Sequence, residues 1–418
     1  MTNDPVAWLY GLQSYGVKLG LEGIRALLGL LDHPERNTPS LLVGGTNGKG
    51  SVSAMLDAIF TASGRRTGLY TSPHLVRPNE RIRIAGEDVA DAELHRILEM
   101  VRAACVRGMA EGKLGGHPSF FEVMTAVALC AFRDARVDLA VLEVGLGGRL
   151  DATNATEPIV SAIVTVSLDH VDTLGGTLEA IAVEKAGIVR TGRPLVSGVE
   201  QREVVTVLRA RCDALRATFV DARVTPLPSG VRPTLHGDHQ RANARVAVAT
   251  FEAFCRELGR ESDSLAIRRG LETARWPGRL QWVPGTPSIL LDGAHNVAGA
   301  EALAAHLALR GGPKPVLLLA AMSDKNIAGI LRPLVPHVAS VVATKPDVLR
   351  AAESGDVASA ARELGLPARA EIAPARALKQ ARDLAGADGV VLVAGSLYLV
   401  GAVLALLEGG ASPGPVSM

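Results

Sequence analysis

The sequence predicts an α/β protein built on two mostly parallel sheets. Short apolar runs rich in β-branched residues alternate with longer amphipathic segments along most of the 418 residues, a pattern typical of strands covered by helices. The alternation is interrupted at 276–287, which holds three prolines and two glycines, and then restarts. At about 150 residues per domain, the length suggests two or three domains. We therefore expect two, 1–284 and 285–418.

The strands expected in the first domain end on residues that can do chemistry. The clearest of them are 40–45, 138–145 and 162–170. The first leads into a glycine-rich loop, the second ends near Glu143, and the third ends at Asp169 and His170. Because ligands bind beyond the carboxyl ends of strands in open α/β sheets, we expect these groups to meet at one edge.

The second domain repeats this pattern with its own set of apolar runs. The expected strands there lie within 288–296, 315–326, 339–346 and 389–396. The Pro-rich stretch 224–233 is interpreted as a loop inside the first domain rather than as a boundary.

Composition excludes several classes of function. The 44 Lys and Arg nearly balance the 43 Asp and Glu, and aromatic residues make up 3%, so neither a broad basic field nor a base-stacking platform for nucleic acid is expected. The four cysteines form no C-x-x-C pair, which favours isolated buried thiols over a zinc or redox site. The longest uncharged apolar run, 397–407, falls short of the roughly 18 residues that span a bilayer, and no secretory signal is evident. We expect a cytoplasmic protein without membrane or nucleic-acid partners.

The segment GGTNGKGS, 44–51, has the context of a phosphate-binding loop. It follows an apolar strand and precedes an apolar-periodic helix, so that backbone N–H groups and the helix N-terminus can face an anion while Lys49 reaches its terminal phosphates. Gly50 separates Lys49 from Ser51, which makes Ser51 the candidate that faces a metal ion. The alternative is a glycine-rich turn capped by Ser and Thr.

Three further groups have both a chemical and a purely structural interpretation. Glu143 at a strand end is the usual magnesium partner of a phosphate loop, or a solvated carboxylate. His170 is a metal ligand or base, or a capping residue. Glu184 and Lys185, in a helix-like segment, form an unexceptional ion pair if nothing else engages them. The G-L-G-G run after Glu143 lacks the last glycine of a dinucleotide fingerprint and is rejected as one.

Ten short motifs together resemble one family. They are TNGKGS (46–51), TSPHL (71–75), NERIRI (79–84), FFE (120–122), LEVGLGGRLDATN (142–154), LDH (168–170), EKAGI (184–188), WPGR (276–279), DGAHN (292–296) and GSLYLV (395–400). In this order they resemble the bacterial bifunctional dihydrofolate synthases/folylpolyglutamate synthases of the Mur ligase superfamily. The resemblance implies the Mur ligase architecture: a P-loop-containing N-terminal ATPase domain with a mostly parallel sheet, and a smaller Rossmann-like α/β C-terminal domain.

The resemblance implies an ATP-dependent amide ligase. Such an enzyme adds L-glutamate to dihydropteroate and to reduced folates through an acyl phosphate, and releases ADP and phosphate. A folylpolyglutamate synthase without the dihydropteroate step remains an alternative. A cell-wall ligase is less favoured because only about 40 residues precede the phosphate loop. A regulatory nucleotide switch is not favoured either, since no N-K-x-D segment follows the loop.

The resemblance also assigns roles to residues. ATP binding falls to Thr46, Asn47, Gly48, Lys49, Gly50, Ser51, Asn243, Arg279, Asp292 and His295. Two Mg²⁺ sites are implied, the first held by Ser51 and Glu143 and the second by Glu143 and His170. Lys185 matches a lysine that carries a carbamate, and Lys49, His170, Lys185 and His295 form the implied catalytic set. The pterin substrate would contact Ser72, Pro73, His74, Arg81 and Phe121, and glutamate would contact Lys325 and Ser396. A monomer is expected.

Overall fold

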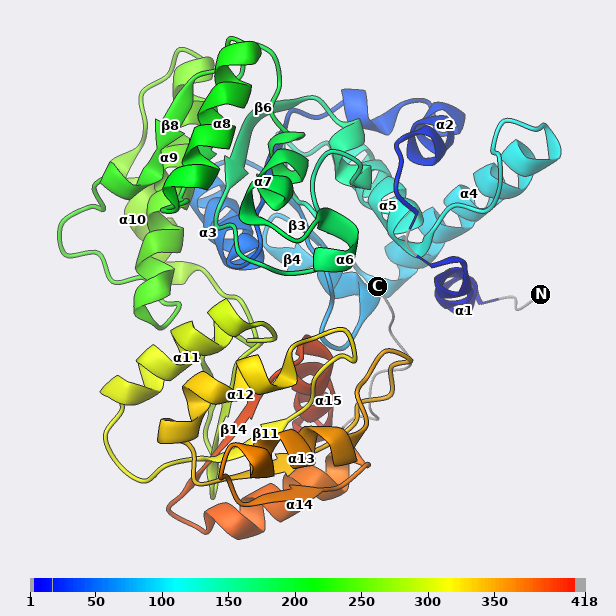
Figure 1. Ribbon diagram of the computed structural model, residues 1–418. Helices are drawn as coiled ribbons and strands as arrows, with labels where there is room; N and C mark the ends of the chain where they lie inside the picture. Colours follow the sequence, from blue (N-terminus) through cyan, green and yellow to red (C-terminus); the bar gives the residue numbers. More distant parts are fainter. Residues whose placement is uncertain (1–3, 17, 410–418) are drawn as a thin grey trace.

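The computed structural model describes residues 4–16 and 18–409, which form two lobes, each built on one sheet (Figure 1). The first sheet comprises β1 (Ser40–Gly44), β2 (Thr67–Tyr70), β3 (Ile82–Ile84), β4 (Glu87–Asp88), β5 (Leu139–Glu143), β6 (Pro158–Ile163), β7 (Leu195–Ser197) and β8 (Phe219–Asp221). The second comprises β9 (Gln281–Val283), β10 (Ser288–Leu291), β11 (Val316–Leu319), β12 (Ser340–Ala343), β13 (Ala368–Ala370) and β14 (Val390–Ala394). The mixed α/β class with two mostly parallel sheets is confirmed.

The first sheet has the strand order β4-β3-β2-β5-β1-β6-β7-β8, and its central strands are parallel. Strand β1 lies between β5 and β6 and is buried along its whole length, which explains its uninterrupted apolar sequence. Its register sets Val43 opposite Glu143 and Gly44 opposite Ile163. The phosphate loop, Glu143 and the segment that follows β6 therefore leave the sheet at the same edge.

Helices cover both faces of the first sheet. One face packs against α3 (Lys49–Ala62), α9 (Asp238–Glu257) and α10 (Ser264–Thr273). The other packs against α1 (Pro5–Gly11), α2 (Glu22–Leu30), α4 (Asp91–Ala110), α5 (Phe120–Asp134), α7 (Leu178–Ala186) and α8 (Arg202–Ala214). The short helix α6 (Val171–Leu174) begins directly after His170. Each face thus has its own apolar core.

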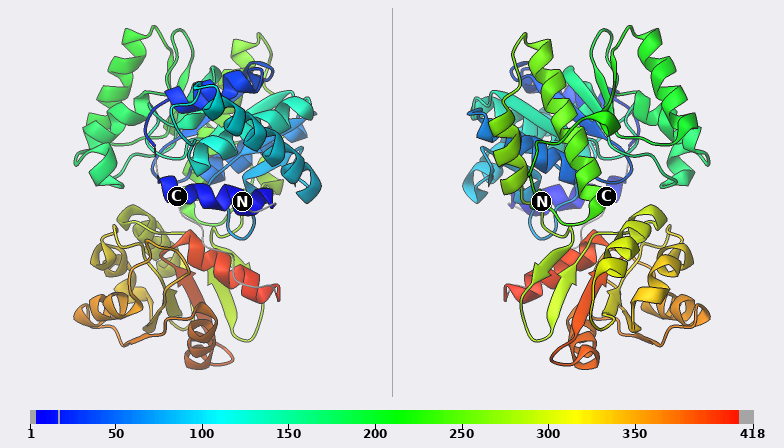
Figure 2. Two further views of the ribbon diagram at one scale, coloured as in Figure 1. Left: turned by 90° about the vertical axis from the view of Figure 1, so that its right-hand side faces the viewer. Right: turned by 90° about the vertical axis from the view of Figure 1, so that its left-hand side faces the viewer.

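The second sheet has the order β13-β12-β11-β14-β10-β9 and is covered in the same way. One face carries α11 (Val297–Leu309), α12 (Ile327–Leu334) and α13 (Ser354–Glu363), and the other carries α14 (Pro374–Ala385) and α15 (Leu397–Leu407). The two side views in Figure 2 show both lobes, with α1 lying where they meet. There Tyr10 of α1 packs against Met322, Val348 and Ala351 of the second lobe.

Two expected boundaries differ from the structure. The strand expected at 162–170 is β6, Pro158–Ile163, and ends seven residues before His170. Beyond it Thr165 pairs with the phosphate loop instead of a strand, since its carbonyl accepts a hydrogen bond from Thr46 N at 2.8 Å. The stretch 276–287, expected to be only a linker, contains β9, which pairs antiparallel with β10 at the edge of the second sheet.

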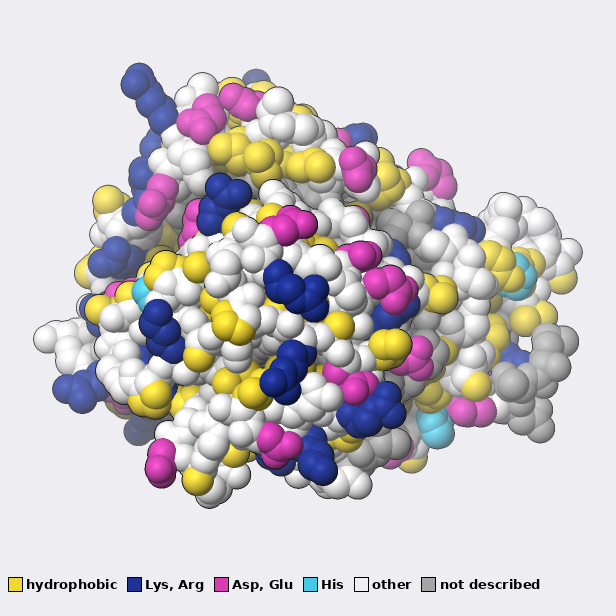
Figure 3. Space-filling view, turned by 60° about the horizontal axis from the view of Figure 1, so that its bottom comes forward, with side chains coloured by type: hydrophobic (Ala, Val, Ile, Leu, Met, Phe, Trp, Pro, Cys, Tyr) yellow, Lys and Arg dark blue, Asp and Glu magenta, His cyan; other side chains and the backbone are white. Residues whose placement is uncertain are grey.

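The remaining features concern the surface and the cysteines. All four cysteines are buried and unpaired, as expected. Within the described part of the chain, no helix is both long and apolar enough to cross a membrane. Basic and acidic side chains are interspersed on the face shown in Figure 3, in keeping with a net charge of +1.

Candidate active site

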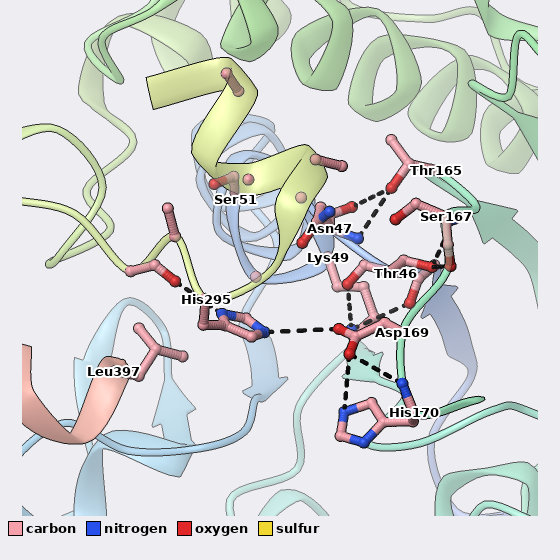
Figure 4. Close-up of a pocket in the computed structure, with 18 of the residues that line it drawn as sticks. Thr46, Asn47, Lys49, Ser51, Thr165, Ser167, Asp169, His170, His295 and Leu397 are labelled. Atoms are coloured by element: carbon pink, nitrogen blue, oxygen red, sulfur yellow. Dashed lines mark hydrogen bonds and ion pairs between the residues drawn. The ribbon is translucent and has the colours of Figure 1, made fainter. Parts of the chain in front are cut away.

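A cavity of about 380 Å³ lies between the two lobes, at the carboxyl edge of the first sheet. It is lined by most of the residues that the sequence singled out: Thr46, Asn47, Gly48, Lys49, Gly50, Ser51, Ser72, Pro73, Glu143, His170, Lys185, Asn243, Arg279, Asp292, His295, Lys325 and Ser396. Figure 4 shows part of it, with His295 approaching Asp169 from the other lobe. The structure therefore brings residues that are hundreds of positions apart to one space.

The phosphate loop passes into α3 through Gly48. This residue has φ +82°, and a Cβ added to it would lie 2.5 Å from Asn243 Oδ1, so the position favours glycine on both counts. Lys49 follows as the first residue of α3, and its Nζ donates hydrogen bonds to the carbonyls of Gly45 and Thr46, both at 3.1 Å. The loop thus places an ammonium group beside the N-terminus of a helix, where anions bind.

Helix α9 reaches the loop through two amide side chains. Asn243 Nδ2 donates to Gln240 Oε1 at 2.9 Å, and Gln240 Nε2 donates to Ser51 Oγ at 3.2 Å. All three side chains are buried. Sequence reasoning missed Gln240, although it lies three residues before Asn243 and so one turn away on the same helix face. The chain of amides orients the Ser51 hydroxyl.

Glu143 is a buried carboxylate at the cavity wall. Its Oε2 accepts a hydrogen bond from Ser72 N at 3.1 Å. Burial raises the pKa of Glu143 above its ordinary value, and the nearby charges of Lys49 and Arg279 oppose that rise. Glu143 forms no ion pair within 4–16 and 18–409, and such a desolvated carboxylate suits a cation or a proton at this position.

Asp169 lies at the centre of the contacts between the lobes. It forms an ion pair with Lys325 Nζ, and its Oδ2 accepts a hydrogen bond from Asn296 Nδ2 at 2.9 Å. His170 Nε2 lies 4.0 Å and His295 Nε2 lies 3.9 Å from its carboxylate oxygens (Figure 4). Burial raises the pKa of Asp169, but the Lys325 hydrogen bond and charge outweigh it and keep the pKa below its ordinary value. Sequence reasoning noticed Asp169 at a strand end but assigned it no role.

Two of the three histidines that line the cavity, His170 and His295, are held neutral near pH 7. Burial lowers the pKa of His170 to about 4, despite the opposing charge of Asp169. Burial also lowers the pKa of His295. His295 Nδ1 donates a hydrogen bond to the Gly293 carbonyl at 2.8 Å, which leaves Nε2 as the lone-pair atom that faces the cavity.

Lys185 is buried, and its Nζ donates a hydrogen bond to the Gly45 carbonyl at 3.0 Å. Burial, helped by the charge of Lys49, lowers its pKa from 10.5 to about 7. The ion pair with Glu184 that the sequence left open is absent among the described residues, because Glu184 instead pairs with Arg149 at 2.9 Å. Lys185 thus presents an amine that is largely unprotonated at slightly basic pH.

The lowered pKa predicts a pH-dependent stability cost. Below pH 7 the buried amine is protonated in the folded chain as well as in the unfolded chain, and the buried charge lowers the free energy of unfolding. Between pH 7 and 10.5 mainly the unfolded chain is protonated, so this cost falls as the pH rises. We expect Lys185→Met to raise the melting temperature in CO₂-free buffer. The free energy of unfolding should increase by on the order of a few kcal/mol at about pH 6, and this increase should shrink by about pH 9.5. Thermal denaturation at both pH values measures it. Lys113→Met, at an exposed site, should show no such trend, and an equal gain at both pH values would contradict the prediction.

Asp292 and Arg279, at the edge of the second lobe, line the cavity, and hydrogen bonds to the backbone hold their side chains in place. Asp292 accepts hydrogen bonds from Leu280 N at 3.0 Å and from Ala294 N at 2.9 Å. Arg279 Nη1 donates to the Gly278 carbonyl at 3.1 Å. A Cβ on Gly293 would overlap this guanidinium, so a glycine at 293 is what allows Arg279 to occupy its position at the cavity wall.

Three residues expected to contact the pterin lie away from the cavity lining. Arg81 is buried and its Nε donates to His74 Nδ1 at 2.8 Å, while Tyr10 Oη lies 3.3 Å from His74 Nε2. Phe121 packs with its ring centroid 5.9 Å from that of Tyr70. None of His74, Arg81 and Phe121 lines the cavity, whereas Ser72 and Pro73 do.

Comparisons with known proteins agree with this geometry. Residues 278–397 match the family described as Mur ligase, glutamate ligase domain. The chain is 33% identical to the dihydrofolate synthase/folylpolyglutamate synthase of Bacillus subtilis, over 95% of this chain and 97% of that protein. It is 37% identical to a probable bifunctional folylpolyglutamate synthase/dihydropteroate synthase of Haloferax volcanii, of which it spans 49%.

A solved structure of a bifunctional folylpolyglutamate synthase/dihydrofolate synthase, with Mn, AMPPNP and L-glutamate bound, superposes with a TM-score of 0.85 at 33% identity. The match covers 97% of this chain and 98% of that one. Identity of this level over nearly the full length, together with the shared fold, establishes the relationship: the chain belongs to the dihydrofolate synthase/folylpolyglutamate synthase family of ATP-dependent ligases.

Proposed function

We propose that this chain joins L-glutamate to dihydropteroate and to the γ-carboxylate of folates, with conversion of ATP to ADP and phosphate. The observation that carries the proposal is the shared cavity: Lys49 of the phosphate loop and Glu143 line it from one lobe, and His295 and Lys325 line it from the other. Such a site can bring a nucleotide, an acceptor carboxylate and an amino acid together. The relative with Mn, AMPPNP and L-glutamate bound supports the nucleotide and the amino acid of this set.

ATP would lie along the loop from Thr46 to Ser51. The backbone N–H groups and Lys49 would hold its phosphates, and Asn243 would lie near the adenine. Arg279, Asp292 and His295 would complete the site from the other lobe, with Asp292 towards the ribose and His295 towards the γ-phosphate. The fixed guanidinium of Arg279 and the lone pair on His295 Nε2 suit these positions.

The residues present fit magnesium. No group of three or more His, Cys, Asp or Glu side chains poised around one point occurs in 4–16 and 18–409. Mg²⁺, however, usually takes one or two protein ligands together with phosphates and waters. The Ser51 hydroxyl and the buried Glu143 carboxylate would hold one ion, and Glu143 and His170 a second. When bound, the metal would reduce repulsion between the anionic reactants.

Lys185 suits a carbamate. Carbamate formation requires an unprotonated amine, and a pKa of about 7 supplies one at slightly basic pH. The product would be an anion in place of a cation, next to the loop that carries Lys49. That anion would then face the second metal site.

The acceptor carboxylate would attack the γ-phosphate of ATP, which forms an acyl phosphate and releases ADP. The α-amine of glutamate would then attack the acyl carbon and, with loss of a proton, displace inorganic phosphate to leave the amide. Lys49 would neutralise charge on the transferring phosphoryl group, and the two lobes would exclude water from the acyl phosphate. Ser72 and Pro73 would contact the pterin substrate, and the hydrogen bond from Arg81 would hold His74 of the same segment in place.

Lys325 and Ser396 would contact the glutamate. Both line the cavity, and Ser396 also caps α15 by accepting a hydrogen bond from Tyr398 N at 3.2 Å. We further propose that 1–284 and 285–418 act as the ATP-binding and glutamate-ligase domains of a monomer, although β9 places the start of the second sheet at Gln281.

The test is ADP release by the purified protein with ATP, Mg²⁺, L-glutamate and one acceptor at a time. We expect turnover with dihydropteroate and with tetrahydrofolate, each dependent on glutamate, and mass spectrometry should find one added glutamyl unit. Turnover with tetrahydrofolate alone would restrict the function to polyglutamylation. Turnover only with a UDP-linked muramyl acceptor would refute the folate assignment.

A further inference from the structure

A polar network connects the phosphate loop to the second lobe. Its members are Asn47 and Asp169 from the first lobe and Asn296 and Lys325 from the second. We propose that Asp169 and Asn296 are positioning residues, which hold the second lobe against the phosphate loop so that His295 and Lys325 face Lys49. The inference rests on the proposed function, because it concerns the same ligase site.

The side chains of Asn47 and Asn296 form a reciprocal amide pair. Asn296 Nδ2 donates to Asn47 Oδ1 at 3.0 Å, and Asn47 Nδ2 donates to Asn296 Oδ1 at 3.2 Å. Asn47 is itself held from below, since its N donates to Thr165 Oγ1 at 2.9 Å and its carbonyl accepts from the same hydroxyl at 3.0 Å. The partner of Asn296 is therefore a rigid part of the phosphate loop.

Asn296 uses its full hydrogen-bonding capacity. Its second Nδ2 hydrogen goes to Asp169 Oδ2 at 2.9 Å, and its Oδ1 also accepts from Gly299 N at 2.9 Å, which caps α11. Two donors and two acceptor sites are all that an asparagine side chain offers. One side chain thus joins a helix cap of the second lobe to two residues of the first.

Asp169 and Lys325 form the second connection. Their side chains are only 7% and 9% exposed, so the ion pair is largely desolvated and neither group can exchange its partner for water without opening the lobes. Asp169 also accepts from His170 N at 2.9 Å, which fixes its carboxylate relative to His170. The network consequently sets the positions of Asp169, His170 and Lys325, which all line the cavity.

The network also orients His295 and Lys325 because of their neighbours in the sequence. Asn296 directly follows His295, and Lys325 directly precedes Asn326, which caps α12 by accepting from Gly329 N at 2.8 Å. Holding Asn296 and Lys325 therefore holds the starts of two neighbouring helices of the second lobe. A loss of the network should leave each lobe folded and alter how they meet.

The two asparagine caps allow a matched experiment. Asn296→Ser retains a side-chain oxygen that can cap α11 and removes the Nδ2 donors to Asn47 and Asp169. Asn326→Ser makes the same change at a cap that has no hydrogen bond to the first lobe among the described residues. Asp169→Asn is the second test variant, because it keeps the side-chain shape and removes the charge that pairs with Lys325.

The full-length variants are compared by small-angle X-ray scattering without ligands, by ADP titration calorimetry, and by steady-state kinetics. For Asn296→Ser and Asp169→Asn we expect a larger radius of gyration, a kcat about tenfold lower and a higher KM for glutamate. ADP affinity should fall by less than kcat, because the phosphate loop and Asn243 stay together in the first lobe. Asn326→Ser should match the wild type in all four quantities. The split between ADP affinity and kcat distinguishes a positioning role from general destabilisation.

A radius of gyration unchanged in both test variants overturns the inference, whatever their activity. A kcat that falls no more in Asn296→Ser than in Asn326→Ser overturns it as well. If the wild type releases no ADP with either pterin acceptor, the proposed function fails instead, and the scattering comparison still decides whether the network holds the lobes together.

Discussion

Lys49→Ala is expected to lower kcat for glutamate-dependent ADP release by about a thousandfold, the upper end of the loss seen when one preorganised hydrogen-bond donor is removed. Lys49 is the only charged residue of the loop 44–51, and its Nζ already lies among the loop carbonyls, 3.1 Å from those of Gly45 and Thr46. Its contact with the phosphates would strengthen as charge develops during transfer, so the loss should appear in kcat more than in KM.

The control for this variant is Lys113→Ala, which removes an exposed lysine paired with Glu111 at 2.7 Å. It should retain wild-type activity. Lys49→Ala should keep its melting temperature within a few degrees, because Lys49 bonds to loop carbonyls and forms no ion pair in the part of the chain that the structure describes. Substantial turnover by a folded Lys49→Ala protein would show that the loop does not serve phosphate transfer.

Gly293→Ala is expected to lower kcat by about a hundredfold while the protein stays folded. The added Cβ would overlap Arg279 Nη1 and Leu397 Cδ2. Both atoms are the ends of flexible side chains, which can move at a modest cost in stability, but the guanidinium would then leave its position at the cavity wall. Steady-state ADP release and thermal denaturation together measure the two effects.

Two further variants make this prediction specific. Gly355→Ala, in α13 of the same lobe, adds a Cβ with no heavy atom within 4 Å and should behave as the wild type. Arg279→Lys keeps a positive charge but loses the planar donor fork, and should reproduce much of the loss. Full activity of Gly293→Ala would mean that the position of Arg279 is unimportant for turnover.

Local pattern was sufficient for the part of the site that one segment builds. The loop 44–51 could be recognised because a buried strand, glycines, a lysine and an apolar-periodic helix follow one another directly. Glu143 could be placed at the same sheet edge as the loop, because apolar runs predict parallel strands whose ends share an edge.

What the sequence could not predict depends on contacts between distant segments. The pairing of Asp169 with Lys325 joins residues 156 positions apart, and that of Asn47 with Asn296 joins residues 249 apart. The burial that lowers the pKa of Lys185 likewise arises only when helix α7 packs beneath the loop.

The predicted strand boundaries were wrong for a related reason. The apolar run through Val164 and Val166 continues beyond β6, but Thr165 turns its hydrogen bonds to the phosphate loop. The Pro and Gly residues of 276–287 suggested a linker, whereas Gln281–Val283 finds a partner in β10. In both places tertiary pairing decided the outcome, while the periodicity of the sequence gave no signal.

The burial of all four cysteines makes distance spectroscopy on this protein straightforward. Burial raises the pKa of the Cys105 and Cys130 thiols to about 12, so that almost no reactive thiolate is available at neutral pH. A single cysteine introduced at the surface of each lobe could then carry a fluorophore or spin label without prior removal of the native thiols. Opening and closing between the lobes could be followed during turnover on the otherwise unaltered chain.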